Sequence, residues 1–168
     1  SAPDTPPFNV NGELSVQSQT WSVEKLTGKM GDSDMGGLVR INLGQKKPML
    51  TVDLTSSSLD FDDLGVVFGI PLGTGSGETE NVEQVKAKEV YDRSARLIPD
   101  AQIDFDRLSA VNADINFVAS KVVDAPSGIN AMTLTGTLRD SVLDFERALV
   151  KTSTGDLDAK INIDASKK

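Results

Sequence analysis

Apolar and polar residues alternate along most of this chain, at the two-residue period of β-strands that turn one face toward a core. Near Glu24 and Lys25 the apolar positions pass from odd to even numbers, which predicts a β-bulge inside a strand. Short connections join the runs of the first half, so we expect a four-stranded antiparallel meander there. Its predicted strands cover residues 8–16, 20–30, 35–43 and 50–54.

The second half returns to the same alternation and predicts four more strands, over residues 113–119, 132–138, 143–149 and 157–165. The predicted fold is therefore mainly β, with antiparallel meanders of about eight strands and two or three short helices, arranged as a curved sheet, a sandwich or a groove. The apolar face of such a sheet must be covered by the sheet itself, by a second sheet or by a long apolar ligand. Periodicity alone favours a sheet that closes on itself.

A short motif recurs three times, as Leu-Asp-Phe-Asp at residues 59–62, Ile-Asp-Phe-Asp at 103–106 and Leu-Asp-Phe-Glu at 143–146. Such recurrence indicates a repeated supersecondary unit. We predict that Asp60 and Asp104 cap short helices, with Asp63 at the capping-box position after Asp60. A calcium loop is the alternative interpretation, but its D-x-[DN]-x-[DN]-G spacing is missing.

The chain is expected to form one domain. We expect residues 1–7 to be a linker or the end of a fragment, and residues 8–168 to form the domain. Within the domain, residues 70–99 are expected to be a mobile insertion that opens with Pro-Leu-Gly-Thr-Gly-Ser-Gly. We interpret this insertion as a surface excursion, or alternatively as a segment that docks a partner. The chain opens with no signal peptide and has no run of about 20 apolar residues. We therefore expect a soluble piece of a longer protein.

Composition limits the chemistry, because the chain has no His and no Cys. It lacks the commonest general base, the thiol nucleophile and the usual transition-metal ligands, so we expect no metal and no cofactor. Neighbouring acids such as Asp60 with Asp62 could serve a glycosidase, but no aromatic platform for a sugar accompanies them. We predict that the protein is not an enzyme.

The charge balance excludes one class of partner. The chain has 17 Lys and Arg against 25 Asp and Glu, a net charge of −8, and no basic cluster. Nucleic acid is therefore not an expected partner. An anionic membrane surface is disfavoured for the same reason, unless apolar contacts bring the protein to lipid.

Several segments together resemble the AsmA family. The first, residues 26–37, contains a G-x-x-G-x-S-x-x-x-G pattern, and the second, residues 47–64, is a strand introduced by proline and followed by leucine and acids. Residues 103–117, 134–143 and 155–165 continue the resemblance in the same order. The final hairpin departs from the family, since it has Thr154-Gly155 where members often carry Gly-Gly.

The resemblance implies a periplasmic domain of a protein that is anchored in the bacterial inner membrane and involved in outer-membrane biogenesis, with the membrane anchor outside this fragment. It also implies kinship with TamB-like and YhdP-like proteins, whose repeating β-grooves conduct phospholipid. We therefore expect phospholipid or another acyl-chain ligand as partner, together with envelope assembly proteins. The alternative is a closed β-sandwich that serves as a non-catalytic interaction scaffold for envelope assembly. Candidate lipid-lining residues are Val10, Leu14, Val39, Ile41, Leu50, Val52, Phe117, Leu134, Ile161 and Ile163.

Overall fold

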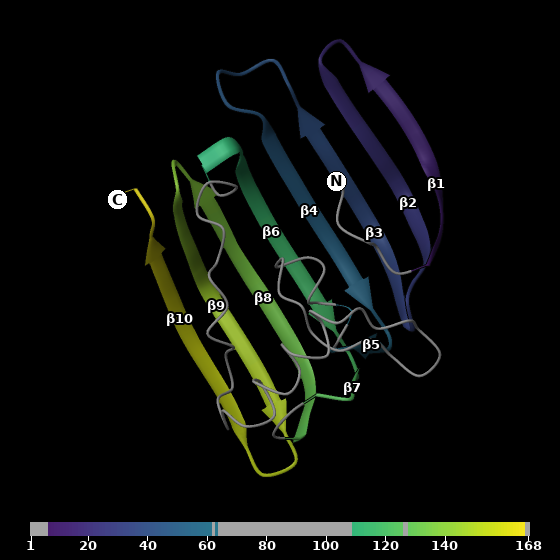
Figure 1. Ribbon diagram of the computed structural model, residues 1–168, viewed down its shortest axis with the longest axis vertical. Helices are drawn as coiled ribbons and strands as arrows, with labels where there is room; N and C mark the ends of the chain where they lie inside the picture. The colour runs from purple at the N-terminus through teal and green to yellow at the C-terminus, as the bar shows by residue number, and fades with distance from the viewer. Residues whose placement is uncertain (1–6, 62, 64–108, 126–127, 167–168) are drawn as a thin grey trace, which may run out of the picture.

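The computed structural model of this chain contains one open β-sheet of eight strands and a small sheet of two strands (Figure 1). The structure describes residues 7–61, 63, 109–125 and 128–166, and these residues form no complete helix. The prediction of a mainly β fold with about eight long strands is confirmed. In chain order the strands are β1 (Phe8–Gln17), β2 (Thr20–Met30), β3 (Ser33–Asn42), β4 (Met49–Ser56), β5 (Leu59–Asp60), β6 (Asn112–Ala119), β7 (Val122–Val123), β8 (Ile129–Arg139), β9 (Val142–Thr152) and β10 (Asp156–Asp164).

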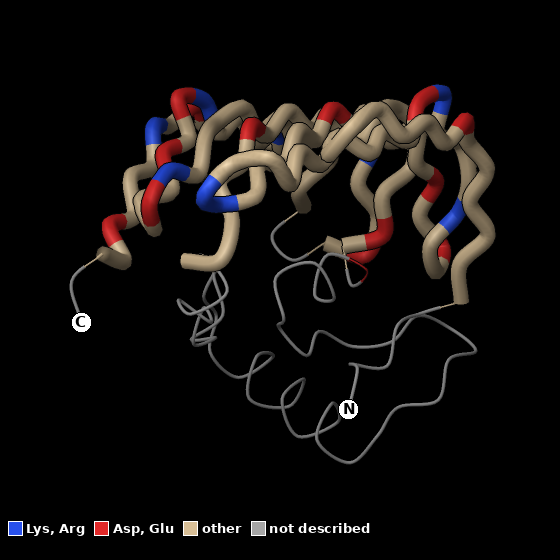
Figure 2. Tube along the Cα trace, turned by 90° about the horizontal axis from the view of Figure 1, so that it is seen from above, with Lys and Arg blue, Asp and Glu red and all other residues tan. Residues whose placement is uncertain are grey.

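The large sheet has the strand order β1-β2-β3-β4-β6-β8-β9-β10. Strands β1 to β4 form the expected antiparallel meander, and β6, β8, β9 and β10 pair antiparallel as well. Among the described strands this sheet neither closes on itself nor meets a second large sheet, because β1 and β10 stay at its two edges. Figure 2 shows it as an arch whose two edges bend toward the same side. The closure that periodicity alone favoured is therefore not formed by this part of the chain.

The two halves of the sheet meet through a parallel pair, β4 with β6, which the expected antiparallel meanders did not include. The pairing continues past a bend into the second sheet, where β5 pairs with β7. The register stays constant through the bend, since Met49 pairs with Asn112 and Leu59 with Val122, an offset of 63 residues in both cases (112 − 49 = 122 − 59 = 63). The bend from β4 into β5 and the bend from β6 into β7 therefore lie side by side at the same point along the paired strands.

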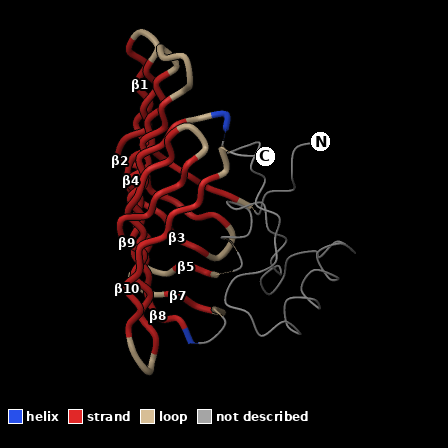
Figure 3. Tube along the Cα trace, turned by 90° about the vertical axis from the view of Figure 1, so that its left-hand side faces the viewer, coloured by secondary structure: helices blue, strands red, loops and turns tan. Residues whose placement is uncertain are grey.

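The bend carries β5 and β7 off one face of the large sheet (Figure 3). There Leu59 and Val122 form a buried cluster with Ala119, and the partly buried Phe117 and Met132 pack against it. Ala119 retains only 1% of its surface exposed. The cluster thus covers one end of that face with the protein's own side chains.

Two β-bulges shift the side chains of β2 and β9, and the pairing of β8 with β9 has a further irregularity between Ile129 and Ala131. The predicted bulge in β2 is confirmed: Val23 pairs with Val39 while Leu26 pairs with Gly37, and Lys25 between them has φ 50°. A second bulge in β9, next to Phe145, was not expected from the sequence. Each bulge lets the apolar residues on both of its sides face the same way.

The predicted helix cap at Asp60 is wrong, because Asp60 lies in β5 and the residues after it, Phe61 and Asp63, lie in turns. The carboxylate of Asp63 instead accepts hydrogen bonds from Ser33 N at 3.0 Å and Ser33 Oγ at 2.5 Å, which ties it to the start of β3. The predicted cap at Asp104 and the insertion at 70–99 lie outside the described residues.

Candidate functional site

The strand register gathers apolar residues on one face of the large sheet. Directly paired residues of neighbouring strands point to the same face. One row of such pairs crosses all eight strands without a polar residue: Leu14, Val23, Val39, Val52, Ile115, Gly136, Phe145 and Ile161. A second complete row, beside it, consists of Val16, Trp21, Ile41, Leu50, Ala113, Leu138, Leu143 and Ile163. We call this side of the sheet the apolar face.

A third row, from β2 to β10, continues the apolar face toward the β5–β7 end: Leu26, Gly37, Leu54, Phe117, Leu134, Ala148 and Ala159. Val10 lies beyond this row and pairs with Gly28. All ten candidate lining residues therefore share the apolar face, and they come from six of the eight strands: β1, β3, β4, β6, β8 and β10. Strands β2 and β9 contribute further apolar residues that were not among the candidates.

The candidate lining residues are not sealed inside the protein. Val10 and Leu14 are exposed, at 39% and 65% of their surface, and the other eight are half-buried. Phe8 and Leu157, at the two edges of the same face, are 70% and 58% exposed. The face therefore retains accessible apolar area, which in a water-exposed protein usually marks a binding surface.

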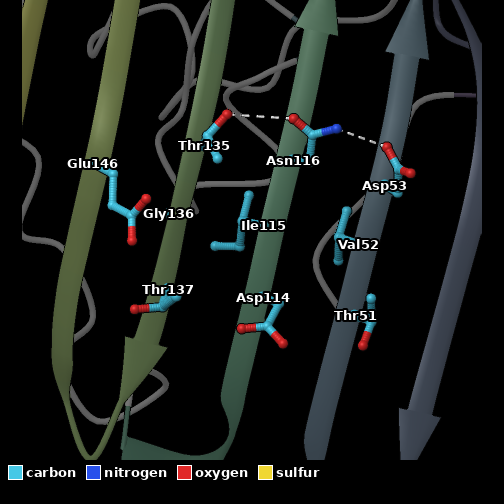
Figure 4. Close-up of a pocket in the computed structure, with 10 residues that line it drawn as sticks. All are labelled: Thr51, Val52, Asp53, Asp114, Ile115, Asn116, Thr135, Gly136, Thr137 and Glu146. Carbon is cyan, nitrogen blue, oxygen red and sulfur yellow. Dashed lines mark hydrogen bonds between the residues drawn. The ribbon is translucent and has the colours of Figure 1, made fainter.

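The opposite face is polar. Asn116 donates a hydrogen bond to Asp53 at 2.9 Å and accepts one from Thr135 at 3.4 Å, so one polar row crosses β4, β6 and β8 (Figure 4). A shallow depression of about 320 Å³ lies there, lined by Thr51, Val52, Asp53, Asp114, Ile115, Asn116, Thr135, Gly136, Thr137 and Glu146. Most of these side chains pair with each other or face water, so this side suits contact with solvent.

Gly136 interrupts the first apolar row, and Phe145 of β9 compensates for it. A Cβ atom on Gly136 would lie 2.7 Å from Phe145 Cδ1, which shows how closely the ring approaches the glycine. Phe145 is only 9% exposed as a result. The aromatic ring thus fills the gap that the missing side chain would leave in the row.

A cluster of serine and aspartate side chains holds the bend in place at one end of the apolar face. Asp34 Oδ1 accepts hydrogen bonds from Ser58 N at 2.7 Å and Ser56 Oγ at 2.9 Å, and Asp60 N donates to Ser33 Oγ at 2.9 Å. The hydrogen bond from Ser58 N, more than any other contact, lowers the pKa of the Asp34 carboxyl below its usual value of 3.8.

Sequence reasoning missed this cluster, although it joins two of the segments that resemble the AsmA family, residues 26–37 and 47–64. One signal was available: Ser33 and Ser56 stand at positions where the alternation calls for apolar residues. Both are almost completely buried, at 2% and 3% exposure. A buried serine at such a position needs a hydrogen-bond partner, which here is a neighbouring aspartate.

Neither a metal centre nor a membrane span is found in the described part of the chain. Its His, Cys, Asp and Glu side chains nowhere gather in a group of three that could hold a metal ion. None of the helical segments searched there has the length and apolar character needed to cross a bilayer.

Comparison with known proteins gives the class of this chain. The AsmA family model matches residues 3–168, so the chain belongs to the AsmA family, as its motifs indicated. Membership supports a role connected with the cell envelope. The chain is similar to the AsmA family protein YhjG of Escherichia coli (strain K12), with 26% identity over 172 residues that cover 99% of this chain and 25% of YhjG. It thus spans about a quarter of that relative's length, and no solved structure matches it.

Proposed function

We propose that this chain is a periplasmic part of an AsmA-family protein anchored in the bacterial inner membrane, and that it holds phospholipid acyl chains along its apolar face. In this proposal it contributes to outer-membrane biogenesis and performs no catalysis. The observation that carries the proposal is the pair of rows that cross all eight strands without a polar residue, together with the ten candidate lining residues on the same face, which are half-buried or exposed.

The size of the apolar face suits a hydrocarbon chain. Eight strands spaced by about 4.8 Å make a sheet about 34 Å wide, and strands of this kind rise about 3.3 Å per residue. Burial contributes roughly 0.8 kcal/mol per methylene, so half of an acyl chain in contact would supply enough free energy to retain a lipid. Such binding is non-directional and needs no cofactor.

The polar face supports the same proposal. Ion pairs join Arg139 to Asp114 and Arg147 to Asp158 across neighbouring strands there, the second at 3.3 Å. A sheet with one charged face and one apolar face can lie between water and hydrocarbon, with the lipid headgroup left in water. Sliding along the apolar rows would then require no chemical step.

The test is native mass spectrometry of the chain purified from bacteria, combined with uptake of a fluorescent fatty acid. Val52→Glu places a carboxylate in the centre of the apolar face and should abolish uptake. Thr51→Glu is the matched control, because its side chain lies on the polar face one residue away, and it should leave uptake unchanged. Circular dichroism confirms that both variants fold. Absence of both co-purified lipid and fatty-acid uptake in the unaltered chain would refute the proposal.

Envelope assembly proteins are a second proposed class of partner, favoured by the free edges of the sheet. Every residue of β1 is exposed, and the strand carries a single charged residue, Glu13. An edge of this kind can accept a strand from another protein. Val16 and Trp21 are a non-hydrogen-bonded pair, so the main-chain N–H of Val16 points away from β2. Val16→Pro should block such pairing, and cross-linking in cell envelopes with and without this variant would test it.

A further inference from the structure

One corner of the sheet exposes a group of large apolar side chains. It lies where β1 turns into β2 and β3 leads into β4, at the top of Figure 1. Four side chains there keep about half of their surface or more exposed: Leu14 at 65%, Val16 at 50%, Trp21 at 45% and Leu43 at 49%. We call these four residues the apolar corner.

The four residues form one surface. Val16 and Trp21 are cross-strand partners, and Leu14 lies two residues before Val16 on the same face. Leu43 joins them because its main-chain N donates a hydrogen bond to Gln19 O at 2.8 Å, which holds the loop after β3 against the β1–β2 turn. All four residues therefore lie at the same corner of the sheet.

The charge around this corner differs from that of the rest of the chain. Residues 14–22 and 41–50 include Lys46 and Lys47 but no Asp or Glu, although the chain has 25 acidic residues. Lys47 Nζ lies 2.9 Å from Asp140 Oδ1, whereas Lys46 is exposed and forms no ion pair within the described residues. The corner thus combines apolar side chains with local positive charge.

We propose that the apolar corner, together with Lys46 and Lys47, docks onto the surface of an anionic lipid bilayer. Tryptophan favours the interface between water and hydrocarbon, because its ring is apolar and its N–H needs a polar partner. Lysines beside inserted apolar residues attract anionic headgroups. A second copy of this chain fits less well, because its corner would bring lysines against lysines.

The net charge of −8 disfavours an anionic membrane surface, but the charge close to the apolar corner matters more for docking there. Surface charges act over a Debye length of about 8 Å at physiological salt, so distant carboxylates repel the bilayer weakly. Asp140 pairs with Lys47 at 2.9 Å and offsets part of the local positive charge, whereas Asp164 ends β10, at the opposite edge of the sheet from β1. The chain would therefore approach the bilayer with β1 to β4 first.

Docking does not depend on the proposed binding of acyl chains, although Leu14 and Trp21 belong to the apolar face. Bilayer contact at this corner would bring that face to the membrane, where lipid could enter it. The two ideas therefore need separate measurements.

The single tryptophan of the chain provides the reporter. Vesicles of phosphatidylethanolamine and phosphatidylglycerol should bind the protein in a sedimentation assay and shift the emission of Trp21 to shorter wavelength. Bromine-labelled acyl chains should quench that emission. Replacing both lysines, as Lys46→Gln with Lys47→Gln, should weaken vesicle binding by about twentyfold to thirtyfold. Leu43→Ser should weaken it by about tenfold or more.

Matched controls separate docking from general effects. Lys151→Gln with Lys160→Gln changes the net charge equally on β9 and β10, and Leu157→Ser removes an exposed leucine from β10. Both should bind vesicles as the unaltered chain does. The proposal is overturned if the folded protein does not bind these vesicles, if the controls lose binding equally, or if Trp21 emission stays unchanged on binding. Vesicle binding with neither co-purified lipid nor fatty-acid uptake would refute the proposed function and leave docking intact.

Discussion

Leu59→Ala tests whether the bend at β5 and β7 stabilises the sheet. Leu59 is 5% exposed and packs with Ala119 and Val122 in the buried cluster. Truncating a buried leucine to alanine costs about 2–5 kcal/mol, because it removes apolar contacts and leaves a cavity. The bend closes only one side of the cluster, which allows partial collapse, so we expect a loss of about 3 kcal/mol.

Urea unfolding followed by circular dichroism measures this loss. With a slope of about 2 kcal/mol per molar urea, a loss of 3 kcal/mol lowers the unfolding midpoint by about 1.5 M. Leu157→Ala is the control, since Leu157 is 58% exposed and should change stability by less than about 0.5 kcal/mol. Equal, small effects of the two variants would refute the view that the bend contributes to the core.

Two further predictions concern stability. Gly136→Ala should destabilise the protein by about 1–3 kcal/mol, because the new Cβ would lie 2.7 Å from Phe145 Cδ1, whereas Gly155→Ala, with nothing within 4 Å, should be nearly neutral in the same urea assay. Hydrogen bonds from Ser58 and its neighbours lower the pKa of Asp34, so its ionised form stabilises the fold above its ordinary pKa of 3.8 and this stabilisation is lost as the pH falls through the lower, folded-state value. Asp34→Asn should therefore flatten the acid side of the stability profile, and an unchanged profile would contradict that role.

The candidate site shows how much of the apolar face could be predicted from alternation alone. Val39 and Val52 were predicted to line the groove because they alternate with polar residues in their own strands, and the strand register pairs them directly. Trp21 and Phe145 belong to the same face and alternate as expected, but they were not among the candidates, because alternation within one strand does not show which residues of other strands lie beside it. The local alternation therefore predicted the apolar face but only some of the residues that form it.

The sequence by itself determined the eight long strands, the bulge in β2 and the apolar character of one face, because a two-residue period is a local property of the chain. Only the tertiary structure decided that β4 and β6 meet in parallel, that both bend at one level, and that Ser33 and Asp63 hold the bend. These features depend on pairing between residues far apart in the chain, which no local period encodes. The open edges and the exposed corner follow from the same long-range pairing.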